Sequence, residues 1–149
     1  MKLSMGLPTQ KEELGILNRF LNGQPYEELR TVCTEEDVCR TREEIKTVYV
    51  HPQLLEYITA LVQATRESRE ILSGVSPRGT LAMLHGCQAY AWLQGRTYVV
   101  PEDIQTVAVP VMAHRLVLSR GYGSTVSGEE QMKEILEQVK VPTEEWERR

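Results

Sequence analysis

The sequence predicts an all-α fold, a compact bundle of about six helices, and two observations carry this prediction. Capping sequences mark the starts of helices, and the stretches behind them carry apolar residues at spacings of three and four. The β-branched and aromatic run at 48–50 is too short to support a sheet alone. With 149 residues, of which 41% are apolar, the chain is long enough to bury a core as one domain.

Three helices are expected in the first half of the chain. Thr9 and Glu12 form a capping-box pattern before a helix that should end at Asn22–Gly23. Thr34 precedes a second helix with an acidic first turn, which the helix dipole favours. His51–Pro52 opens a third helix with a broad apolar stripe. This stripe comprises Leu54, Leu55, Ile58, Leu61, Val62 and Thr65.

The fourth helix is the longest apolar one, from Pro77 to about Gln94, and should stop at Gly95. It is apolar nearly all round, which predicts a buried central helix. Small residues recur on one of its faces and would allow a neighbouring backbone to approach closely. These residues are Gly79, Ala82, Gly86 and Ala89.

A fifth helix is expected from Pro101 and a last one after Ser127. Pro110 should kink or split the fifth helix, because proline lacks the N–H of a helical hydrogen bond. Ser127 and Glu130 repeat the capping-box pattern. Two placements of the last helix stay open, on its own domain or on a neighbouring subunit.

The chain is interpreted as one region with two parts. Residues 1–120 form the helical domain with a connector at its start, and residues 121–149 add a loop, the last helix and a frayed tail. Glycines after Leu118 mark the loop, and the tail begins at Pro142.

Composition argues against several classes of function. A net charge of −4 argues against nucleic-acid binding, which needs a basic face. No apolar run is long enough to span a bilayer and no signal peptide is present, so we expect a cytoplasmic protein. The 3 cysteines form no C-x-x-C pair and fit no closed disulfide framework, so we expect reduced thiols and no metal site.

The segment Gly74–Gly79 is the strongest candidate site. Ser76 can cap the fourth helix, and Pro77 suits its first position. Arg78 is unusual, because a cation beside the positive end of a helix dipole is unfavourable. The placement suits an anion, since free backbone N–H groups and an arginine together make a phosphate site. The alternative is a solvated arginine whose stem packs on the helix start.

Catalytic chemistry has little support within this chain. Gly74–Gly79 has the glycine spacing of a P-loop, but Thr80 stands where the lysine is needed and no hydrophobic strand precedes it. The chain alone therefore cannot hydrolyse a nucleotide by that mechanism. Thr65–Arg66 and His114–Arg115 are interpreted as structural residues at helix ends. Acids at 102 and 103 suit a first helical turn and are not interpreted as a catalytic pair.

Five segments in a fixed order carry a family resemblance. They are Thr65–Arg66, Gly74–Arg78, Gly95–Val99, Pro101–Asp103 and His114–Leu116. In this order they resemble the C-terminal helical lid of MoxR-type AAA+ ATPases. Met5–Thr9 with Glu12–Glu13 is similar to the segment that joins that family's core to its lid. The chain departs from the family at Leu7, often a tyrosine, and at Val100, often a threonine that would cap the fifth helix.

The resemblance implies a lid that covers ATP and Mg²⁺ held by an α/β core domain, which this chain lacks. Arg78 would be the second sensor, directed at the terminal phosphates, with Ser76, Pro77 and Gly79 forming the helix start beside it. The family's members typically form hexameric rings, hydrolyse ATP and act as chaperone-like remodelers. The implied partners are the core domain, neighbouring ring subunits and a von Willebrand A domain protein.

Two alternatives stay open. The chain begins where the family's core would still be running, so we expect Met1 to start a fragment, with a stand-alone product as the alternative. The rival function is a free-standing helical adaptor that binds protein through an apolar face and has no nucleotide role.

Overall fold

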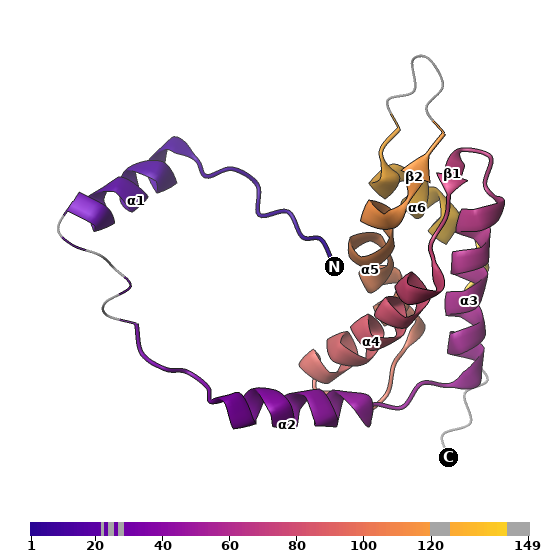
Figure 1. Cartoon of the computed structure of the whole chain (residues 1–149), viewed down its shortest axis with the longest axis horizontal. Helices are drawn as coiled ribbons and strands as arrows, with labels where there is room; N and C mark the ends of the chain where they lie inside the picture. The colour runs from indigo at the N-terminus through magenta and orange to yellow at the C-terminus, as the bar shows by residue number, and fades with distance from the viewer. Residues whose placement is uncertain (22, 24–25, 27–28, 120–125, 143–149) are drawn as a thin grey trace. The chain divides into compact units, whose positions relative to one another are not determined.

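The computed structural model of the chain describes residues 1–21, 23, 26, 29–119 and 126–142 (Figure 1). These residues form mainly α-helices, with one 3-10 helix and one two-stranded sheet, which confirms the predicted all-α class. The elements are α1 Gln10–Leu21, α2 Glu35–Lys46, α3 Pro52–Glu67, β1 Ile71–Ser73, α4 Pro77–Leu93, α5 Pro101–Met112, η2 Ala113–Arg115, β2 Val117–Leu118 and α6 Gly128–Gln138.

The chain divides into two compact units. The larger unit consists of Met1–Lys2 and Arg42–Arg149, and the smaller unit consists of Leu3–Thr41. The boundary that we predicted at residue 120 falls outside the described residues and stays a prediction.

The core of the larger unit lies between α3, α4, α5 and α6. Helix α4 packs along α5, while α6 packs against α3, α5 and η2 (Figure 1). The last helix is thus seated on its own unit, which answers the question that the sequence left open. Several of the large side chains between these helices are completely shielded from solvent, and each such burial contributes roughly 1.5–3 kcal/mol. They include Leu54, Leu61, Met83, Ile104, Met112 and Met132.

Helix α4 approaches α5 closely through one small residue. A Cβ atom on Gly86 would lie 2.9 Å from Val107 Cγ1 and 3.5 Å from Val111 Cγ2, so the predicted close approach is confirmed there. The prediction that α4 is buried all round is wrong. Leu81 and Leu93 are 58% and 70% exposed, because the neighbouring helices cover only one side of α4.

A short sheet, which the sequence did not predict, closes the loop between α3 and α4. Strand β1 pairs antiparallel with β2, with Ile71 opposite Leu118 (Figure 1). The Ser119 N–H extends the pairing by donating to the Glu70 carbonyl at 2.8 Å. A single parallel bridge between Tyr49 and Tyr98 is the only role that the 48–50 run takes in strand pairing among the described residues.

One of the two effects predicted for Pro110 does not occur. The helix α5 is not split there, because it runs on to Met112 and passes into η2. A kink at Pro110 stays a prediction. Ser127 and Glu130 cap α6 reciprocally, as predicted. A Cβ atom on Gly128 would lie 2.6 Å from the Ala113 carbonyl oxygen, so a glycine is needed where α6 meets η2.

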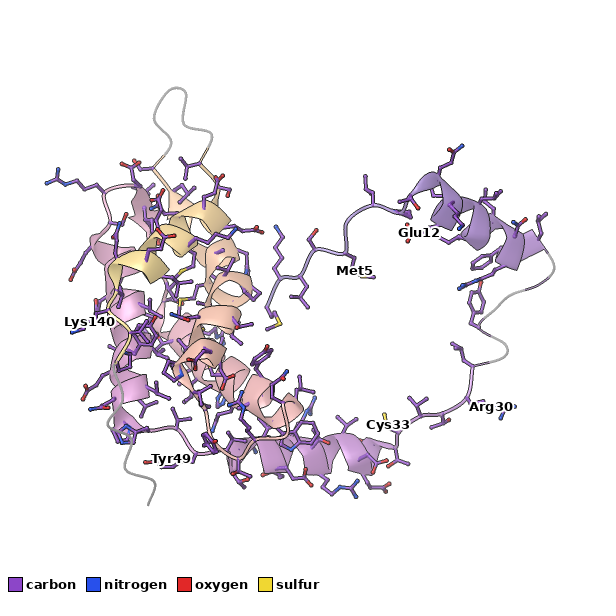
Figure 2. All side chains as sticks on the ribbon, turned by 180° about the vertical axis from the view of Figure 1, so that it is seen from behind. Met5, Glu12, Arg30, Cys33, Tyr49 and Lys140 are labelled. Carbon is purple, nitrogen blue, oxygen red and sulfur yellow. The ribbon has the colours of Figure 1, made fainter. Side chains whose placement is uncertain are left out.

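The smaller unit contains helices with complete N-terminal caps but no buried side chains on α1. The Thr9 N–H donates to Glu12 Oε2 at 2.7 Å, and the Glu12 N–H donates to Thr9 Oγ1 at 3.4 Å, which confirms the predicted capping box. Figure 2 labels Glu12 at the start of α1. Thr34 and Asp37 form the same reciprocal pair at the start of α2. The predicted end of α1 at Asn22 falls outside the described residues.

Candidate anion site at the start of α4

The backbone at the start of α4 has the geometry of a helix N-cap. Ser76 is extended, with φ −75° and ψ 164°, and Pro77 occupies the first helical position. The Ser76 carbonyl accepts hydrogen bonds from the N–H groups of Gly79 at 2.8 Å and Thr80 at 3.2 Å. The Ser76 side chain, however, makes no capping hydrogen bond. The predicted side-chain cap is therefore wrong, and only the backbone of Ser76 caps the helix.

Several hydrogen-bond donors at this helix start have no acceptor. In the described part of the chain, nothing accepts from the N–H groups of Ser76 and Arg78, from the Ser76 hydroxyl or from the Arg78 guanidinium. Ser76, Pro77 and Arg78 are all exposed, whereas Gly79 is buried. The surface thus presents a set of free donors, one of them cationic, at the positive end of a helix dipole.

Two side chains in the last turn of α3 hydrogen-bond to Val75, the residue directly before Ser76. The Thr65 hydroxyl donates to the Val62 carbonyl at 2.6 Å and accepts from the Val75 N–H at 3.0 Å. Arg66 Nε donates to the Val75 carbonyl at 2.9 Å. The N–H and the carbonyl of Val75 are therefore both bonded to α3, and its side chain is only 1% exposed.

Sequence reasoning missed this role of Thr65 and Arg66, which it interpreted as ordinary helix-end residues. One signal was available. Thr65 continues the apolar stripe of α3, so its hydroxyl had to be buried and to find a partner. The sequence could not show that this partner is the N–H of Val75, ten residues further along the chain.

Gly74 and Gly79 allow the chain around the start of α4 to pack closely against neighbouring residues. A Cβ atom on Gly74 would lie 2.6 Å from the Thr65 carbonyl oxygen, so the chain passes directly against the end of α3. A Cβ atom on Gly79 would overlap the side chain of Val75 and lie 3.4 Å from Arg115 Cδ. The spacing of these glycines, which resembles half of a P-loop, is explained here by packing.

Three arginines from different elements meet this region. Arg66 comes from α3, Arg78 from α4 and Arg115 from η2, where its Nε donates to the Val111 carbonyl at 2.9 Å. None of the three forms an ion pair with a carboxylate among the residues that the structure describes. The surroundings of the free donors are therefore electropositive, which suits an anionic ligand.

Of the two acids at the start of α5, Asp103 has a structural role. Asp103 is 1% exposed, and its carboxylate accepts from both Arg96 terminal nitrogens at 2.8 and 2.5 Å. These bonds raise the pKa of Arg96 above its ordinary value. The carboxylate also accepts from the Val100 N–H at 2.9 Å. As predicted, Val100 supplies no side-chain cap, and Asp103 provides the other half of a capping box.

Neither an activated thiol at Cys87 nor a cluster of metal ligands is found in the described part of the chain. Burial raises the pKa of the Cys87 thiol to about 12, which leaves it protonated at neutral pH. The described residues contain no group of three or more His, Cys, Asp or Glu side chains that could hold a metal ion. The free donors at the start of α4 are suited to binding an anion.

Comparisons with known proteins identify relatives of this chain. A family model described as an AAA lid domain matches residues 63–138. The Bacillus subtilis protein YeaC is 38% identical over 144 residues, which are 96% of this chain and 45% of YeaC. Chaperone MoxR1 of Mycobacterium tuberculosis is 28% identical over 95% of this chain and 40% of its own length.

A solved structure shares the fold. The crystal structure of a candidate ATPase from Cytophaga hutchinsonii superposes with a TM-score of 0.84 at 28% identity. The match covers 96% of this chain and 46% of that one. The chain therefore spans a little under half the length of these proteins.

Proposed function

Because the chain belongs to the AAA lid domain family, as its resemblance to the lid of MoxR-type AAA+ ATPases predicted, we propose that it covers ATP bound by an α/β core. In this proposal Arg78 is the residue that senses the terminal phosphates, and the helix start formed by Ser76, Pro77 and Gly79 lies beside them.

The observation that carries the proposal is the set of free donors at the start of α4. A structural arginine is expected to pair with a carboxylate or a carbonyl, as Arg96 does with Asp103. Arg78 does neither within the described residues, although it stands where the helix dipole disfavours a cation. An incoming phosphate would satisfy the guanidinium, the backbone N–H groups and the hydroxyl together.

These residues fit a phosphate and do not fit a metal ion. The donor set contains only N–H and O–H groups, which complement anionic oxygens. Since the described residues offer no cluster of metal ligands, Mg²⁺ would be held by the core domain. When bound, ATP supplies a terminal phosphate that is lost on hydrolysis. The role of this chain is to bind and orient that end of the nucleotide.

Sensing follows from the difference between two positions of the lid. The Arg78 guanidinium can donate to the phosphate only when the lid lies over the nucleotide, and a charge-assisted hydrogen bond contributes roughly 1.5–3 kcal/mol. A ligand shifts an equilibrium by its differential affinity for the two states. This difference would favour the closed position roughly 10- to 150-fold.

The proposal also covers the longer protein in which this chain would be the lid. We expect a ring of subunits, typically six, that couples ATP hydrolysis to chaperone-like remodeling, because one of the relatives is named a chaperone. The partners would be the core domain, the neighbouring subunits and a von Willebrand A domain protein. No helix in the described part of the chain is long and apolar enough to cross a membrane. A cytoplasmic location is a further part of the proposal.

Replacing Arg78 with alanine in the full-length protein tests the proposal. We expect the rate of ATP hydrolysis to fall about 10³-fold or more, by analogy with other arginines that contact a transferred phosphate. Arg69→Ala is the matched control, because Arg69 is also exposed and has no ion pair in the described chain. Normal hydrolysis by the Arg78→Ala protein would contradict the sensor role.

A further inference from the structure

We infer that Thr65 and Arg66 are positioning residues for Arg78: they clamp the peptide groups of Val75 to the end of α3 and so set where α4 begins. The inference rests on the proposed function, because it assigns Arg78 a ligand. It adds a role for two residues that do not themselves need to touch this ligand.

In this clamp, the side chains of Thr65 and Arg66 bind both backbone polar groups of Val75. The Thr65 hydroxyl accepts from the Val75 N–H at 3.0 Å, and Arg66 Nε donates to the Val75 carbonyl at 2.9 Å. With both its N–H and its carbonyl bound, Val75 cannot rotate its flanking peptides without breaking a hydrogen bond. Val75 lies three residues before Arg78, so its orientation is passed on to the first turn of α4.

Packing reinforces the hydrogen bonds on both sides of Val75. On one side, Gly74 lies so close to α3 that a Cβ atom would be 2.8 Å from the Arg66 nitrogen. On the other, the Val75 side chain fills the space beside Gly79 in the first turn of α4. The end of α3 and the start of α4 are therefore joined through contacts that leave no space for a shift.

The clamp matters for function because the free donors belong to the same turn. The N–H groups of Ser76 and Arg78 are part of the backbone whose path Val75 determines. A displacement of about 1 Å at a binding group can reduce a rate about 10²-fold. Without the clamp, the first turn would still be helical but would no longer be held at one position.

The Thr65 hydroxyl can be removed with little change of shape. In the full-length protein, Thr65→Val is nearly isosteric and deletes both hydrogen bonds, whereas Thr65→Ser keeps the hydroxyl. We expect Thr65→Val to slow single-turnover ATP hydrolysis about 10- to 100-fold, and Thr65→Ser to retain most of the wild-type rate. Thr59→Val is the matched control, because Thr59 also lies on α3 and bonds only the Leu55 carbonyl, at 2.8 Å.

A double-mutant cycle separates positioning from general stability. If Thr65 acts mainly through Arg78, Thr65→Val should cause a much smaller fold loss of single-turnover rate in the Arg78→Ala protein than in the wild type. Equal fold losses in the two backgrounds would overturn the inference, as would a wild-type rate for Thr65→Val alone. If Arg78→Ala itself hydrolyses ATP normally, the proposed function fails first, and this outcome is read directly from that single variant.

A second variant covers the case in which Thr65→Val does not fold, which far-ultraviolet circular dichroism would show. Arg66→Met keeps the aliphatic stem of an exposed side chain and removes only the donor to the Val75 carbonyl. It should slow single-turnover hydrolysis about 10-fold in the wild-type background and have a much smaller effect in the Arg78→Ala background. A loss of the same size in both backgrounds would overturn the inference.

Discussion

Helices α1 and α6 begin with the same kind of N-terminal cap, but their side chains differ in how far they are buried. Each opens with a reciprocal capping box, formed by Thr9 and Glu12 in one helix and by Ser127 and Glu130 in the other. Helix α6 buries Met132 and Ile135 almost completely, whereas α1 buries no residue. The two helices show that caps and periodicity define where a helix starts, while burial depends on what packs against it.

The same contrast separates the two units. In the larger unit, α3 to α6 share one apolar core, and the AAA lid match at 63–138 falls within this unit. In the smaller unit, the apolar residues of α1 stay exposed, with Leu17 at 64% and Phe20 at 51%. A helix of 12 residues has marginal stability in water without tertiary packing. Three pairs of variants test this contrast.

The largest effect is expected from truncating the same residue type in the two helices. Ile135→Ala removes a side chain that is 1% exposed and should lower the free energy of unfolding by about 2–5 kcal/mol, because it leaves a cavity. Ile16→Ala on α1, at 48% exposure, should change it by less than about 0.5 kcal/mol. Urea denaturation of the two variants measures both values. Equal losses would mean that α1 is packed as tightly as α6.

A smaller difference is expected between two ion pairs. Arg96→Met leaves the buried Asp103 carboxylate without its cation and should lower the free energy of unfolding by about 2–3 kcal/mol. Arg40→Met removes the partner of Asp37 in an exposed pair of the smaller unit and should lower the free energy of unfolding far less, because solvent screens the pair. Thermal denaturation of both variants tests the difference. A loss of similar size for Arg40→Met would contradict it.

The smallest effect is expected from the two capping boxes. Ser127→Ala should lower the free energy of unfolding of the larger unit by about 1 kcal/mol, because the Glu130 N–H loses its acceptor. Thr9→Ala removes the matching cap of α1 and should leave the unfolding midpoint unchanged while reducing the helicity of α1. Urea denaturation and the NMR chemical shifts of α1 report the two quantities. A lower midpoint for Thr9→Ala would show that α1 unfolds together with the larger unit.

Much of the fold could be predicted because its signals are local. Capping boxes span four residues, and the predicted starts of α1, α4, α5 and α6 agree with the structure. The small-residue face of α4 correctly predicted the close approach at Gly86. Burial was harder to predict, since Leu81 is as apolar as Met83 but lies on a side of α4 that no helix covers.

At the candidate site, too, some features follow from the local sequence and others from tertiary contacts. The sequence by itself determined that Arg78 stands in the first turn of a helix, because Ser76–Pro77 sets the start of α4 through interactions within a few residues. Only the tertiary structure decided that the Ser76 hydroxyl stays free and that Thr65 and Arg66 hold Val75. These bonds join the end of one helix to the start of the next. They form because the β1–β2 pairing and the contact at Gly74 return the chain to α3, and no local pattern encodes that return.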